Sequence, residues 1–249
     1  MKILATYNIK GGVGKTSAAV NLAYLAARDG ARVLLWDLDP QGAATFLFRV
    51  KPRVKGGGRR LVRGVSDVDT LIKGTDHADL DLLPADFSYR HMDLVLDDAK
   101  RPTRRLRRLL APLAEDYDLM FLDCPPSISL VSENVFEAAD ALLVPLIPTT
   151  LSLQAFEHLT AFVEREVAKP PDLLAFFSMV DRRKRLHREV METLPSRHRS
   201  VLKAAIPASA DVENMGVHRN VLAAFAAQSR AALAYDALWS EISARLHAR

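Results

Sequence analysis

The sequence predicts an α/β fold with a doubly wound, mostly parallel sheet and helices on both of its faces. Short apolar runs alternate with helical patterns along most of the 249 residues, as in repeated strand–helix units. Some runs are apolar at consecutive positions, such as Val33 to Trp36, which is typical of strands covered on both faces. With 49% hydrophobic residues and no evident linker, we expect one domain over residues 1–249.

The first strand–helix unit contains a glycine-rich loop. An apolar strand at residues 3–7 leads into Asn-Ile-Lys-Gly-Gly-Val-Gly-Lys-Thr at 8–16, and a helical pattern follows as far as Gly30, which we expect to be a left-handed cap. Glycines let the backbone approach phosphate oxygens, and the N-terminus of the following helix directs N–H groups at the same anion. The predicted nucleotide-binding residues of this loop are Gly11, Gly12, Val13, Gly14, Lys15, Thr16 and Ser17.

Two side chains of the loop suit a nucleoside triphosphate. Lys15 is expected to reach the β- and γ-phosphates, and Thr16 to place its hydroxyl on the Mg²⁺ ion that bridges them. A second lysine, Lys10, precedes the glycine pair, and Ile9 stands where the ordinary pattern has its first glycine. We therefore predict a deviant P-loop. A glycine-rich turn with incidental lysines is less favoured, because a strand precedes the loop and a helix follows it.

Two further strands end in aspartates. The run Val33 to Trp36 continues into Asp-Leu-Asp-Pro-Gln-Gly at residues 37–42, and an apolar strand ends in Asp123, followed by Cys124 and two prolines. Parallel strands of open α/β sheets place ligands at their carboxyl ends, so both acidic segments should lie beside the loop. Asp123 is predicted to hold Mg²⁺, usually through a water molecule. We interpret the lone thiol of Cys124 as a small core residue.

The remaining elements follow from apolar patterning. Residues 46–64 are rich in cations and poor in apolar anchors, which predicts a mobile surface loop that either is solvated or contacts polyanions. Residues 85–98 form a helix or an irregular connection. The leucines and arginines of residues 100–113 predict an amphipathic helix with a basic outer face. Further strands are expected at 79–83, 141–147, 173–180 and 201–206, and helices at 151–167, around 182–188 and at 228–246 with Leu233, Leu238, Trp239, Ile242 and Leu246 inward.

Three motifs together resemble the ParA/MinD family of P-loop ATPases: residues 8–16, 37–42 and 123–127. The resemblance covers nearly the whole chain and is weakest at 49–63. It implies that Lys10 crosses a dimer interface to the partner's ATP, that Asp39 positions the attacking water, and that Asp37 and Gln41 organise the γ-phosphate region. It also implies a loop over the adenine at Pro207, with Ser178 where the family often has Asn. The implied catalytic residues are Lys10, Lys15 and Asp39, and the implied cofactors are ATP and Mg²⁺.

The resemblance to short, Soj-like ParA proteins implies a function. ATP would close a sandwich homodimer that binds DNA without reading sequence, and a ParB-like or cargo adaptor protein would stimulate its weak intrinsic hydrolysis. The cycle would partition or position DNA or a large cargo, without an N-terminal helix-turn-helix of its own. A net charge of +4 favours a polyanionic partner, and the 100–108 helix is a less favoured DNA surface. The predicted DNA contacts are Arg182, Arg183, Arg185, Arg188, Arg219 and Arg230.

Two other classes of P-loop ATPase are alternatives to the ParA-type function. A MinD-like ATPase that cycles on the membrane would need a basic amphipathic C-terminal helix, and the final segment, residues 243–249, is equally well explained by packing on the sheet. An ATPase like the nitrogenase iron protein would need at least two cysteines per chain for its cluster, whereas this chain has one. Since no targeting segment or membrane-spanning run is evident, we expect a cytoplasmic, nucleoid-associated protein without stable membrane association.

Overall fold

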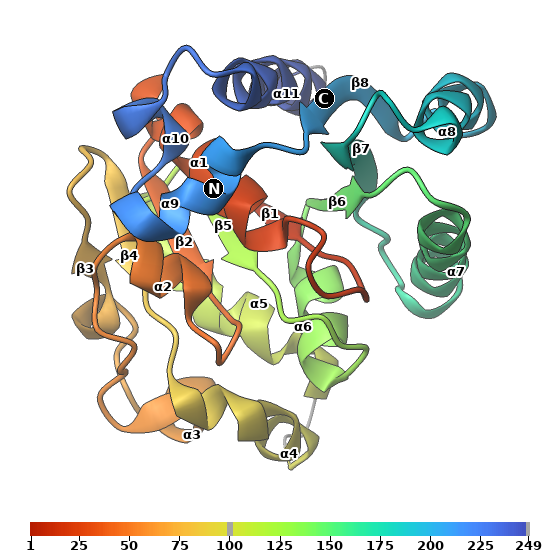
Figure 1. Cartoon of the computed structure of the whole chain (residues 1–249). Helices are drawn as coiled ribbons and strands as arrows, with labels where there is room; N and C mark the ends of the chain where they lie inside the picture. The colour runs from red at the N-terminus through yellow and green to blue at the C-terminus, as the bar shows by residue number, and fades with distance from the viewer. Residues whose placement is uncertain (99–101, 248–249) are drawn as a thin grey trace.

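An eight-stranded sheet forms the centre of the part of the chain that the structure describes, residues 1–98 and 102–247 (Figure 1). In this computed structural model the strand order is β3-β4-β2-β5-β1-β6-β7-β8, and only the β3–β4 pair is antiparallel. The predicted mostly parallel α/β sheet is confirmed. The strands are β1 (Lys2–Thr6), β2 (Val33–Asp37), β3 (Lys73–Gly74), β4 (Leu80–Leu83), β5 (Leu119–Asp123), β6 (Ala141–Leu146), β7 (Asp172–Val180) and β8 (Val201–Pro207).

Helices cover both faces of the sheet because successive strand residues point to opposite sides. Ile3 and Ala5 of β1 pack into one core with α3 to α8, and Leu4 between them packs into a second core with α1, α2 and α9 to α11. The helices are α1 (Lys15–Arg28), α2 (Ala43–Leu47), α3 (Gly57–Val62), α4 (Met92–Asp97), α5 (Arg105–Leu110), α6 (Leu130–Ala138), α7 (Thr150–Glu166), α8 (Arg185–Arg197), α9 (Ala210–His218), α10 (Leu222–Phe225) and α11 (Arg230–His247).

The register of the central strands brings their polar ends together. Thr6 and Asp37, the last residues of β1 and β2, both pair with Asp123, the last residue of β5. The glycine-rich loop leaves β1 at this edge and returns into α1, whose C-terminal turn closes with Gly30 at φ 95°, as predicted. The loop and the two acidic segments therefore share one edge of the sheet.

The interpretation of residues 46–64 as a mobile loop is wrong in part. α2 ends at Leu47 and α3 spans Gly57–Val62, while Val54, Leu61 and Val62 are buried in the core. These anchors are separated by cations in the sequence, so no periodic apolar pattern marks them. The cations themselves are exposed, as expected: Arg49, Lys51, Arg53, Lys55, Arg59, Arg60 and Arg63.

Three other expectations need correction. The helix predicted at 100–113 is the shorter α5 followed by a 3₁₀ turn at Ala111–Glu115 that contains Pro112, with Lys100 and Arg101 outside the described residues. α8 begins only at Arg185, so Arg182 and Arg183 lie in the preceding turn. Leu233 of α11 is 51% exposed rather than inward-facing, and Arg249 of the final segment is also outside the described residues.

No helix within residues 1–98 and 102–247 is both long and apolar enough to span a membrane.

Candidate nucleotide-binding site

Two glycines of the loop are required by its backbone. Gly12 and Gly14 have φ values of 69° and 92°, in the left-handed region that side chains disfavour. A Cβ on Gly14 would also lie 2.8 Å from Oγ of Ser178, whereas a Cβ on Gly11 would meet nothing closer than Pro126 Cγ at 3.9 Å. The described residues therefore leave room for a side chain at position 11. Close approach of a phosphate is the remaining reason for a glycine there.

The loop holds Lys15 above an uncapped helix end. The N-cap of α1, Gly14, offers no side-chain acceptor, and the first turn carries no acidic residue, so its N–H groups remain available to an anion. The ammonium of Lys15, which is 7% exposed, donates to the carbonyl oxygen of Lys10 at 3.0 Å. Burial lowers the pKa of Lys15, and the nearby Asp123, Cys124 and Asp39 oppose that effect. A phosphate oxygen can replace the carbonyl as acceptor.

Lys10 itself is held only through its backbone. Its N–H donates to Oδ1 of Asn8 at 2.9 Å, and the amide of Asn8 in turn donates to the carbonyl of Pro145 at 2.8 Å. The side chain is partly exposed, and its ammonium forms no hydrogen bond or ion pair with the residues that the structure describes. The backbone of Lys10 is thus held in place, while its charge has no ion-pair partner within residues 1–98 and 102–247.

Asp37 and Asp123 form a buried acidic pair. Oδ2 of Asp37 accepts hydrogen bonds from the backbone N–H and the hydroxyl of Thr45 at 2.8 and 2.7 Å. Oδ1 of Asp37 and Oδ2 of Asp123 have no partner among the described residues, although both are fully buried. Burial raises the pKa of Asp37 to about 6 and that of Asp123 well above its usual range. The charge of Asp39 adds to the rise at Asp37, and the charges of Asp37 and Asp39 add to the rise at Asp123.

Orphaned buried carboxylate oxygens of this kind fit a divalent cation. Mg²⁺ is usually held by one or two carboxylates, phosphate oxygens and waters rather than by an all-protein cage. The described residues contain no cluster of three or more acidic, His or Cys ligands, so these residues suit a cation that also binds the phosphates. Thr16, at the start of α1, would supply the hydroxyl, and Asp123 would act from beneath the loop.

Asp37→Asn should raise the stability of the nucleotide-free protein above pH 6. The raised pKa means that the fold favours protonated Asp37, so its stabilising contribution is complete below about pH 4 and is lost as pH rises through about 6. Asparagine can still accept from Thr45 but cannot ionise. Thermal unfolding without Mg²⁺ should give a higher Tm than wild type at pH 8, by roughly 2–4 °C per kcal/mol, and a smaller difference at pH 5. Asp97→Asn, at an exposed position, is the control and should leave Tm unchanged at both pH values. Equal Tm values for wild type and Asp37→Asn at pH 8 would contradict the raised pKa of Asp37.

The loop forms one wall of a pocket of about 390 Å³. Eight of the predicted nucleotide-binding or catalytic residues line it: Gly11, Gly12, Gly14, Lys15, Thr16, Ser17, Asp39 and Pro207. Val13 is buried behind the loop, while Lys10 and Asp123 are outside the lining. The opposite wall comes from β7, the β8–α9 connection and α11. Ile206 and Ala208 flank Pro207 in the segment that the resemblance places over the adenine, and Ser178 stands where the family often has Asn. The lining residues that the sequence did not indicate are Met179, Ser209, Val212, Glu213 and Tyr235.

The predicted DNA-binding arginines fall into two places. Arg182, Arg183 and Arg230 line a neighbouring cavity of about 440 Å³ that shares Pro207 and Ala208 with the first pocket. Arg183 pairs with Asp181 at 2.9 Å. On α8, Arg185 pairs with Glu189, and Arg188 donates to the carbonyls of Arg182 and Arg183. Arg219 lies apart from these at the end of α9, on the opposite side of the molecule from α8 (Figure 1).

Cys124 lies beneath the site but is shielded from it. The thiol is 2% exposed, and burial raises its pKa well above the usual value. A protonated, enclosed thiol is a poor nucleophile, which agrees with its interpretation as a core residue.

A phosphate loop after β1, a buried aspartate at the end of β5 and a pocket at the carboxyl edge of a parallel sheet define a P-loop nucleotide-binding protein. A family model described as an AAA domain matches residues 1–171. The chain is 33% identical to the sporulation initiation inhibitor protein Soj of Bacillus subtilis, over 98% of each protein, and 34% identical to the chromosome partitioning protein ParA of Myxococcus xanthus, over 77% of this chain and 69% of that one. The chain belongs to the ParA/Soj family of P-loop ATPases.

A solved structure agrees with this assignment. Cobyrinic acid a,c-diamide synthase from Mycobacterium smegmatis, with a bound ATP analogue and magnesium, superposes with a TM-score of 0.80 and 27% identity, covering 96% of this chain and 93% of that one. The fold is thus that of a P-loop ATPase.

Proposed function

We propose that this protein is a ParA-type switch, in which ATP drives closure of a sandwich dimer that binds DNA without sequence preference and that hydrolysis releases. The observation that carries the proposal is the meeting of the deviant phosphate loop, Lys15 and Asp39 around one pocket. Kinship with Soj and ParA supports a role in partition. In this proposal residues 1–249 act as one ATPase domain.

Different residues of the site would have different roles in ATP binding and hydrolysis. The loop N–H groups and Lys15 would hold the β- and γ-phosphates, with the β8–α9 wall around Pro207 against the adenine. Thr16 and Asp123 would hold Mg²⁺, which neutralises charge on the phosphate oxygens. Asp39, half-buried at the mouth of the pocket, would accept a hydrogen bond from the attacking water and orient it. Intrinsic turnover would be weak until an adaptor protein acts.

Lys10 gives the proposed dimer its dependence on ATP. Two triphosphates brought face to face repel each other, and a cation placed between them offsets that repulsion. The Lys10 ammonium lacks a partner among the described residues of its own subunit, so it is available to the partner's phosphates. Closure would then require ATP in both sites.

The proposed DNA surface is the arginine-rich rim beside the pocket: Arg182, Arg183, Arg185, Arg188 and Arg230. Arg182, Arg183 and Arg230 line the cavity next to the β8–α9 wall, and Arg185 and Arg188 lie on the adjoining α8. Dimer closure would join two such rims into one stripe. Contacts of this kind bind the phosphate backbone and do not read bases. Arg219 was predicted with this group but lies apart from it, at the C-terminal end of α9. The protein would act in the cytoplasm on nucleoid DNA, with a ParB-like or cargo adaptor as its partner.

DNA binding should require ATP, ignore sequence and weaken steeply with salt. Closure doubles the phosphate contacts, and each contact adds about 0.9 to the steepness of log K against log salt. The slope in ATP should therefore be about twice that of the weak residual binding in ADP at low salt. Fluorescence polarisation on two unrelated duplexes measures both quantities. Arg182→Ala with Arg230→Ala should reduce the slope, whereas Arg107→Ala with Arg108→Ala, on exposed positions of α5, should not.

Two outcomes would overturn this part of the proposal. Equal, tight binding in ADP and ATP would remove the switch. Absence of DNA binding together with ATP-dependent binding to anionic liposomes would move the protein to the MinD-like class, with α11 as the membrane-contacting helix.

A further inference from the structure

Two helices, α2 and α9, begin close to residues that line the nucleotide pocket. α2 follows directly on the turn that bears Asp39, in which Asp39 accepts hydrogen bonds from the N–H groups of Gln41 and Gly42, both at 2.9 Å. α9 follows β8, and its first turns place Val212 and Glu213 in the pocket lining. A displacement of either helix would therefore move one wall of the site.

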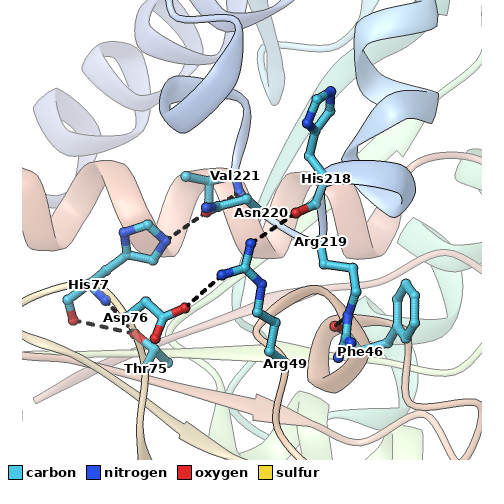
Figure 2. A network of polar contacts seen from close by, with 9 residues as sticks. All are labelled: Phe46, Arg49, Thr75, Asp76, His77, His218, Arg219, Asn220 and Val221. Atoms are coloured by element: carbon cyan, nitrogen blue, oxygen red, sulfur yellow. Dashed lines mark hydrogen bonds and ion pairs between the residues drawn. The ribbon is translucent and has the colours of Figure 1, made fainter.

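The far ends of these two helices are joined by a reciprocal pair of arginines (Figure 2). Arg219, which ends α9, donates from Nε to the carbonyl of Phe46 in the last turn of α2 at 3.0 Å. Its guanidinium also lies 4.5 Å from the centre of the Phe46 ring. Arg49, just after α2, donates to the carbonyl of His218, the last residue of α9, at 3.1 Å. Each arginine thus caps the C-terminus of the other helix, where a positive charge is favoured.

Both arginines occupy strained backbone positions. Arg49 and Arg219 have φ values of 59° and 48°, a region that non-glycine residues seldom adopt. The position just after a helix is usually filled by glycine for this reason. An arginine at these two positions lacks the low conformational cost that glycine has at positive φ. Backbone strain of this kind indicates that the arginine side chains are needed.

The connection between β3 and β4 also contacts Arg49 and the residue next to Arg219. Asp76 pairs with Arg49 at 3.3 Å, and Nε2 of His77 lies 3.0 Å from Oδ1 of Asn220, the residue after Arg219. Oδ1 of Asn220 also accepts from the N–H of Val221 at 2.8 Å, at the entry to α10. Asp76 and His77 thus hold the surroundings of both arginines in place (Figure 2). The Arg49–Asp76 pair is exposed and contributes little stability of its own.

We propose that Arg49 and Arg219 are positioning residues that tie the Asp39 turn to the adenine-side wall of the pocket. A continuous chain of contacts runs from the Asp39 turn through α2 and the two arginines to α9, which returns to the pocket. A nucleotide bound against the β8–α9 wall would therefore also fix the position of Asp39. This inference rests on the proposed role of Asp39 in hydrolysis. It gives Arg219 a task within the subunit, distinct from contact with DNA.

Glycine substitutions separate this role from simple stabilisation of the helix ends. Arg49→Gly and Arg219→Gly relieve the backbone strain, so Tm should stay the same or rise. With DNA absent, kcat for ATP hydrolysis should nevertheless fall by about fivefold or more, while the Kd for ATP, from titration of a fluorescent analogue, stays within about twofold of wild type. Asp79→Gly is the matched control, because Asp79 is exposed and has φ 58°; its kcat should equal that of wild type.

A double-mutant comparison completes the test. If the arginines act through Asp39, Arg219→Gly should cause no further loss of turnover in an Asp39→Ala background. Wild-type kcat in both glycine variants, or a loss fully additive with Asp39→Ala, would overturn the inference and leave the proposed ATPase function intact. An Asp39→Ala protein with wild-type turnover would instead refute the proposed role of Asp39, on which the inference rests.

Discussion

Asp39→Ala should bind ATP and dimerise like wild type while its steady-state hydrolysis falls by about 10²-fold or more. Phosphoryl transfer requires little from the protein beyond charge stabilisation and positioning of the nucleophile. Asp39 is a partly exposed carboxylate in the pocket lining, and the other carboxylate of the lining, Glu213, lies on α9. Asp37 and Asp123 are buried beneath the pocket and would orient water less readily. Phosphate release with ATP in excess over the protein measures the effect.

Lys15→Ala is the control for this experiment. Its ammonium is buried in the loop, so its removal should abolish nucleotide binding, which separates loss of binding from loss of the chemical step. Wild-type turnover in Asp39→Ala would contradict the assignment of the water-positioning residue.

Lys10→Ala should weaken the ATP-dependent dimer far more than the affinity of one subunit for ATP. Truncation of one partner of a buried charge pair across an interface costs about 2 kcal/mol or more, which corresponds to a rise of about thirtyfold in the dimer Kd. Sedimentation velocity over a concentration series in ATP and Mg²⁺ measures this Kd, and titration of a fluorescent analogue measures affinity for the nucleotide.

The matched control for Lys10 is Lys55→Ala, which removes an exposed lysine next to α3, away from the loop, and should dimerise like wild type. A Lys10→Ala protein that dimerises and hydrolyses ATP normally would reduce Lys10 to an ordinary loop residue.

The sheet and the phosphate loop could be predicted because their signals are local. Strands such as β2 are apolar at consecutive positions, and the loop has its glycines, lysine and threonine within nine residues. The carboxyl edge of a parallel sheet then places Asp39 and Asp123 beside the loop without further information. The pairing of Asp37 with Asp123 in the sheet register follows from the same rule.

Other features depend on contacts between distant segments. Arg49 and His218 are 169 positions apart, and Arg219 and Phe46 are 173 apart, so no spacing in the sequence indicates that α2 and α9 meet. Arg219 was grouped with the DNA-binding arginines by charge alone. The buried anchors Val54, Leu61 and Val62 are few and are flanked by cations, and therefore the segment that contains them resembled a solvated loop.

The mass of the wild-type protein in two nucleotide states tests nucleotide-driven closure most directly. Light scattering after gel filtration should give the monomer mass with ADP and Mg²⁺, because Lys10 then lacks the γ-phosphate across the interface. With a non-hydrolysable ATP analogue and Mg²⁺ it should give twice that mass. The same mass in both nucleotides, whether monomer or dimer, would contradict the account.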